Sequence, residues 1–127
     1  MNILEKLTKL EHEAADFGFK WETSHQIIEQ IRSEVVEIDV HLVDGDRCKL
    51  QDEIGDLLHA VFSLCVFNQL DPEYTLTKSV EKFEDRFREV QQLARAKGLH
   101  TLNGQSFNEL MQIWDQAKRI LAKKVNL

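Results

Sequence analysis

Apolar residues recur at steps of three and four along most of the chain, which is the spacing of one face of an α-helix. The longest such series follows Thr23 and Ser24 and contains Ile27, Ile28, Ile31, Val35, Ile38 and Leu42. No segment alternates apolar and polar residues with a period of two, and no internal repeat of about 20 to 50 residues is visible. The pattern therefore predicts an all-α protein.

Glycine, proline and capping residues divide this pattern into segments. Asn2 and Glu5 have the spacing of a capping box at the start of the first segment, and Pro72 predicts a turn before the fourth. A chain of 127 residues can bury one sizeable core, so we expect one domain over residues 1–127. We predict an antiparallel helical bundle of about five helices, covering about 3–16, 24 or 25 to 44, 47–69, 77–97 and 106–124.

The third predicted helix is apolar on every face between Leu57 and Phe67. A helix of this kind must be surrounded by other helices, and we expect the four others of one short chain not to cover it completely. The pattern therefore predicts a homo-oligomer that assembles through this helix. A central helix in a monomeric bundle is the alternative.

The chain is acidic, with 22 Asp and Glu against 16 Lys and Arg and a formal charge of −6. This balance argues against proteins that track nucleic-acid phosphates and against binding to anionic membranes. Charged Glu5 and Lys6 leave no apolar run of signal-peptide length at the N-terminus. The apolar stretch 60–67 is far shorter than the roughly 20 residues of a membrane span. Cys48 and Cys65 form no CxxC motif. We expect a cytoplasmic protein.

Two pairs of carboxylates stand out because they lack the basic neighbours that usually accompany surface acids. They are Glu34-x-x-Glu37 and Glu53-x-x-Asp56, and only Lys49 stands four residues from any of them. Each pair lies on one helix face at the edge of the apolar stripe. Four such acids brought together would repel one another, so a cation must neutralise them. Oxygen ligands favour Mg²⁺ or Mn²⁺ over Zn²⁺. A di-iron site is excluded because it needs Glu-x-x-His on two helices, and no glutamate of these two pairs is followed by a histidine at that spacing.

This arrangement resembles the MazG family of all-α nucleoside triphosphate pyrophosphohydrolases, over about Trp21 to Lys118. Further matches are Trp21 with His25, Lys82-x-x-x-Arg86 and Trp114-x-x-x-Lys118. The resemblance implies that the four acids hold Mg²⁺ and that the enzyme cleaves a nucleoside triphosphate between its α- and β-phosphates. It also implies a house-cleaning role on non-standard or surplus deoxynucleotides, in a homodimer or a dimer of dimers (a homotetramer).

The resemblance points to basic residues for the phosphates. Lys82 and Arg86 lie four residues apart on one face of their helix, where both can reach phosphate oxygens. The alternative is that they pair with acids of the same helix. Lys118 is a further candidate for a phosphate contact.

Three residues are candidates for the rest of the substrate. Trp21 can stack on a base or pack over the next helix. His25 can hydrogen-bond the base or sugar, or cap its helix. Trp114 lies in an apolar stripe, where core packing competes with substrate binding.

Two other functions remain open at this stage. One is a related all-α enzyme that hydrolyses dUTP, dCTP or a phosphoribosyl-ATP. The other is a non-catalytic helical interaction module, which would dock through the apolar third helix. The sequence does not select the base or the sugar.

Overall fold

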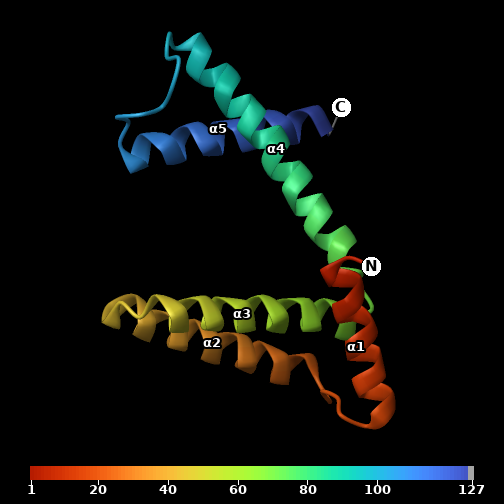
Figure 1. Ribbon diagram of the computed structural model, residues 1–127. Coiled ribbons are helices and arrows are strands. Elements are labelled where there is room, and N and C mark those ends of the chain that lie inside the picture. Colours follow the sequence, from red (N-terminus) through yellow and green to blue (C-terminus); the bar gives the residue numbers. More distant parts are fainter. Residues whose placement is uncertain (126–127) are drawn as a thin grey trace. The chain divides into compact units, whose positions relative to one another are not determined.

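The computed structural model describes residues 1–125, and this part of the chain contains five helices and no strand. The predicted all-α class is therefore confirmed. The helices form two compact units, Met1–Leu76 and the chain from Thr77 onward, which are described separately. The expected single domain over 1–127 stays a prediction, and its last two residues lie outside the described part. The helices are α1 (Ile3–Phe17), α2 (Ser24–Asp44), α3 (Arg47–Phe67), α4 (Pro72–Ala96) and α5 (Phe107–Val125) (Figure 1).

In the first unit, α2 and α3 form an antiparallel hairpin, and α1 packs against α3 near its C-terminal end (Figure 1). Gly45 closes α2 with a left-handed backbone (φ 76°), and its N–H donates to the His41 carbonyl. Asp46 then caps α3 by accepting a hydrogen bond from the Lys49 N–H at 3.1 Å. This tight connection sets the two acid-bearing helices side by side.

The helix starts follow from capping chemistry. Thr23 caps α2 in a complete capping box with Gln26, as its hydroxyl accepts from the Gln26 N–H while the Gln26 side chain accepts from the Thr23 N–H. At α1 the predicted capping box is only half formed. Asn2 accepts from the Glu5 N–H at 2.8 Å, but the Glu5 carboxylate accepts from the Asn2 side chain instead of its backbone.

The predicted start of the fourth helix was wrong, because α4 begins at Pro72 instead of Thr77. Proline suits the first helical position, where its fixed φ is helical and a missing N–H costs nothing. Asp71 completes this start by accepting a hydrogen bond from the Tyr74 N–H at 2.9 Å. The third helix ends at Phe67, before the predicted Gln69, which takes a left-handed φ of 61°.

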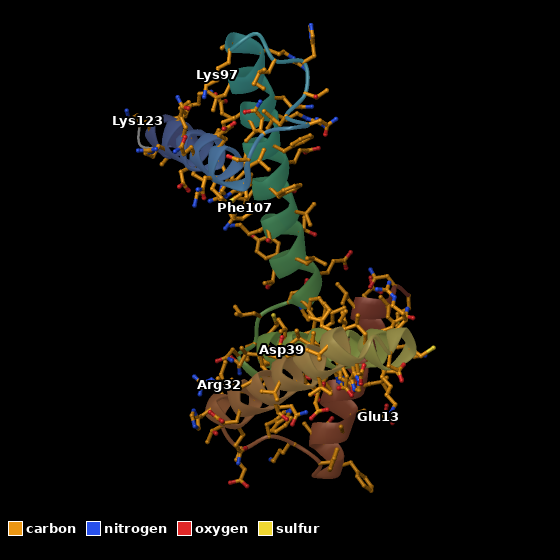
Figure 2. The ribbon with its side chains drawn as sticks, turned by 90° about the vertical axis from the view of Figure 1, so that its left-hand side faces the viewer. Glu13, Arg32, Asp39, Lys97, Phe107 and Lys123 are labelled. Carbon is orange, nitrogen blue, oxygen red and sulfur yellow. The ribbon has the colours of Figure 1, made fainter. Side chains whose placement is uncertain are left out.

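In the second unit, α5 lies across α4 (Figures 1 and 2). Side chains fill the crossing. Its buried centre is Val90, Ile113 and Ala117, with Leu93, Leu102 and Trp114 packed around it. Trp114 therefore does the core packing that the sequence offered as one of its two roles.

The apolar third helix is partly uncovered in one chain. Leu58 is 53% exposed and Val61 is 40% exposed. The predicted oligomer through this helix stays a prediction. Within residues 1–125, no helix has both the length and the apolar character needed to cross a bilayer.

Candidate metal centre and adjoining pocket

The α2–α3 hairpin brings the four predicted acids together in two overlapping groups. Carboxylate oxygens of Glu34, Glu53 and Asp56 lie within 4.8 Å of one another, and so do ligand atoms of Glu37, His41 and Glu53. Glu53 belongs to both groups. Either group could hold a metal ion.

Helical spacing explains this convergence. The acids of each pair are three residues apart, which places them on one side of their helix. Antiparallel packing of α2 against α3 then turns the two pairs toward each other. Among the residues that the structure describes, none of the four acids makes an ion pair. The charge of the cluster is therefore left uncompensated by the protein.

Glu34 shows the strain of this arrangement most clearly. It is only 9% exposed, and its Oε1 accepts a hydrogen bond from Gln30 Nε2 at 2.8 Å. Its Oε2 is the one buried side-chain oxygen without a partner in the described chain. A hydrogen bond to the Glu53 carboxylate that only a protonated Glu34 can donate, then burial, then the charges of Glu53 and Asp56 raise the pKa of Glu34 above its ordinary value. An orphaned carboxylate oxygen among other carboxylates is what a divalent cation would satisfy, so the donor set fits the predicted metal.

His41 is a candidate ligand that the sequence analysis did not assign. It is 9% exposed, and its Nδ1 lies 3.0 Å from Asp44 Oδ2. Because an ionised carboxylate only accepts hydrogen bonds, Nδ1 donates to Asp44, and in the neutral ring this leaves the lone pair on Nε2. Carboxylate-oriented histidines of this kind are common in metal sites. His41 is thus a candidate ligand in addition to the predicted oxygen ligands. The feature of the sequence that points to His41 as a ligand is its position one helical turn, four residues, after Glu37.

A pocket of about 1050 Å³ adjoins the acid cluster and lies entirely within the first unit. Glu34 and Asp56 line it, and so does the predicted base-binding residue Trp21, which is half-buried. The hairpin, α1 and the linker after α1 all contribute walls. Glu34, Asp56 and Trp21 therefore share one cavity.

His25 is not among the residues that line this pocket. It lies in the first turn of α2, with its side chain 76% exposed and its Nε2 3.6 Å from Glu29 Oε1. Thr23 and Gln26 form the cap of α2, so His25 does not supply the cap that the sequence left open for it.

The remaining predicted substrate residues belong to the second unit. The guanidinium carbon of Arg86 lies 5.6 Å from the centre of the Trp114 ring. Lys118 Nζ lies 3.4 Å from Asp115 Oδ1. Neither Lys82 nor Arg86 forms an ion pair with an acid in the described residues, so the proposed pairing within their own helix is absent there.

Comparison with known proteins agrees with these features. The MazG nucleotide pyrophosphohydrolase domain matches residues 22–91. A nucleoside triphosphate pyrophosphohydrolase of Escherichia coli strain K12 is 33% identical over 118 residues, which are 91% of this chain and 44% of the relative. A nucleoside triphosphate pyrophosphohydrolase/pyrophosphatase MazG of Thermotoga maritima is 30% identical over 115 residues, with the same two coverages.

The chain spans less than half the length of these two relatives. The matched segment contains α2 and α3 entire, together with both acid pairs.

Proposed function

The chain belongs to the MazG nucleotide pyrophosphohydrolase family, and from this premise we propose that it hydrolyses (deoxy)nucleoside triphosphates to a monophosphate and pyrophosphate. The observation that carries the proposal is the buried, unpartnered Oε2 of Glu34, which lies in the acid cluster beside a large pocket. A buried carboxylate oxygen without a partner is costly. The cost is explained if the site is built for a cation that arrives with a polyphosphate.

Glu34, Glu37, Glu53 and Asp56 are the proposed ligands of Mg²⁺, or of Mn²⁺. Such an ion, when bound, offsets the negative charge of the triphosphate and of the departing pyrophosphate. One of the four carboxylates orients the attacking water. Two of these acids, Glu34 and Asp56, line the pocket, where phosphate oxygens can approach them.

For the remainder of the substrate we assign roles by chemistry. Trp21 stacks on the base, which its position in the pocket wall supports. Lys82 and Arg86 bind phosphate oxygens, and their lack of acidic partners in the described chain supports this role. His25, Trp114 and Lys118 remain secondary candidates for the substrate. The substrates are surplus or non-standard deoxynucleotides.

A panel of nucleoside triphosphates tests the reaction, with pyrophosphate and orthophosphate measured separately. We expect Mg²⁺-dependent release of pyrophosphate from at least one nucleotide. Release of orthophosphate alone would mean that a different bond is cleaved.

A paired substitution tests the site. Glu53→Gln should lower kcat by about a hundredfold or more, because Glu53 belongs to both candidate metal groups. Asp52→Asn is the matched control: Asp52 is the exposed neighbour outside both groups and should keep wild-type activity. Full activity in Glu53→Gln would remove the metal assignment.

The non-catalytic interaction module is tested by the same protein. Binding to the folded state must raise the melting temperature. We expect Mg²⁺ to raise Tm in the wild type and not in Glu53→Gln. The interaction module predicts equal Tm values with and without Mg²⁺.

A further inference from the structure

A second polar cluster lies in the pocket, where α1 packs against α3. The Glu11 carboxylate accepts a hydrogen bond from Ser63 Oγ, and its same oxygen, Oε1, lies 2.9 Å from His59 Nε2. Since a carboxylate only accepts, His59 donates from Nε2. Ser63 is buried and Glu11 is half-buried, and all three residues line the pocket. Two donors thus fix the Glu11 side chain while both bonds end on one oxygen.

The other oxygen of Glu11, Oε2, has no hydrogen-bond donor within the described residues. It keeps its lone pairs for a donor that enters the pocket. Glu11 precedes the segment 22–91 that matches the family, so the family match assigns it no role.

The position of this cluster along α3 shows which part of a nucleotide it would meet. Asp56, His59 and Ser63 follow one another at steps of three and four on one helix face. Ser63 is seven residues beyond Asp56, or about 10 Å along the axis at a rise of ~1.5 Å per residue. With phosphates at the acid cluster, the nucleoside extends toward Glu11. A carboxylate at this end repels phosphate and suits an uncharged group that donates hydrogen bonds.

The walls near Glu11 favour a flat base over a sugar. Ala14, Ala15, Val66 and Phe67 line the pocket with apolar surface. On such a surface a carboxylate attracts an amino group and repels the lone pairs of a carbonyl oxygen. Cytosine and adenine carry an exocyclic amino group where uracil and hypoxanthine carry a carbonyl.

We propose that Glu11, held in place by Ser63 and His59, reads the exocyclic amino group of the nucleobase. The pocket then prefers cytosine and adenine nucleotides to their uracil and hypoxanthine counterparts. This inference rests on the proposed function, because it takes the phosphates to lie at Glu34, Glu37, Glu53 and Asp56.

Matched substrates that differ at this group and in the hydrogen on the adjacent ring nitrogen test the inference. We expect wild-type kcat/KM to be about 10- to 100-fold higher for dCTP than for dUTP, and for dATP than for dITP. Glu11→Gln replaces the carboxylate, which only accepts hydrogen bonds, by an amide that also donates them. The ratio of kcat/KM for dCTP to dUTP, and for dATP to dITP, should therefore fall toward one in this variant. Ser63→Ala should lower the ratio partway. Glu13→Gln, which changes an exposed residue of the same helix (labelled in Figure 2), should keep the wild-type ratio.

Binding without turnover separates this inference from the proposed reaction. In calorimetric titrations with Mg²⁺, dCMP should bind more tightly than dUMP, and Glu11→Gln should abolish the difference. If the protein binds dCMP more tightly than dUMP but releases no pyrophosphate, base recognition by Glu11 is supported and the proposed hydrolysis is refuted. If pyrophosphate is released with equal kcat/KM for dCTP and dUTP and for dATP and dITP, base recognition by Glu11 is refuted and the proposed hydrolysis is supported.

The sugar is the other source of a hydrogen-bond donor. If Glu11→Gln changes the ratio of CTP to dCTP and leaves the ratio of dCTP to dUTP at its wild-type value, Glu11 contacts the ribose and the inference is overturned. Should Glu11→Gln fail to fold, the wild-type ratios and Ser63→Ala still decide the question.

Discussion

Glu34 is the proposed metal ligand whose surroundings in the fold most disfavour a negative charge. It is buried beside Glu53 and Asp56, and among the described residues only Gln30 donates a hydrogen bond to it. Each of these features works against its ionised form except the bond from Gln30. The acid cluster therefore lowers the free energy of unfolding of the metal-free protein, and binding of the proposed cation restores it.

The raised pKa of Glu34 predicts how stability depends on pH without metal. A carboxyl whose pKa is higher in the folded state binds more protons folded than unfolded. Its contribution to stability therefore falls as pH rises from about its ordinary value of 4.5 through the raised value, and stays low above it. We expect Tm in EDTA to decline over this range in the wild type and to decline less in Glu34→Gln.

The exposed Glu13 provides the control for this titration, because Glu13→Gln should follow the wild-type curve. Parallel Tm curves for the wild type and Glu34→Gln would contradict the prediction. Adding Mg²⁺ should reverse the trend in the wild type, since the metal binds the deprotonated acids.

At the scale of the element, α2 carries Glu34, Glu37 and His41 and depends on a capping box at Thr23. Thr23→Ala removes the acceptor of the Gln26 N–H. We expect the free energy of unfolding to fall by about 1 kcal/mol in a denaturant titration. The rise in Tm on adding Mg²⁺ should persist, because no metal-binding residue changes.

Thr77→Ala is the control for this substitution. Thr77 is exposed inside α4, where alanine is a good helix former, so stability should not fall. A loss in Thr77→Ala equal to that in Thr23→Ala would mean that the cap contributes nothing specific.

For the whole molecule, the exposed apolar face of α3 supports a homo-oligomer, a dimer or a dimer of dimers. Ile54, Leu58 and Val61 are all at least 40% exposed and recur at steps of four and three along this helix. Apolar stripes of this kind on a protein surface commonly mark interfaces. We expect light scattering to give a multiple of the chain mass of 14.8 kDa.

A charge on this face tests the interface. Leu58→Glu should return the protein to the monomer mass, whereas Ile3→Glu, at a more exposed apolar residue at the start of α1, should leave the mass unchanged. A wild-type monomer would end the oligomer prediction.

Local chemistry explains what could be predicted before the structure. Helix spacing, the Thr23 cap, Gly45 and the two acid pairs are properties of residues within a few positions of each other, so the all-α class and the acids of the site follow from the sequence. His41 was within reach of the same reasoning, since it lies one helical turn after Glu37. The start of α4 at Pro72 was missed because proline was taken as a helix breaker instead of a first helical residue.

Tertiary packing decided the rest. Glu11 and Ser63 are 52 positions apart, and no local pattern joins them. Only the packing of α1 against α3 brings their polar groups into the pocket that Glu34, Asp56 and Trp21 line. The sequence by itself determined the helices and which acids they present, because both depend on short-range spacing. The burial of Glu34 and the set of residues that share its pocket depend on contacts between distant segments, which only the folded chain creates.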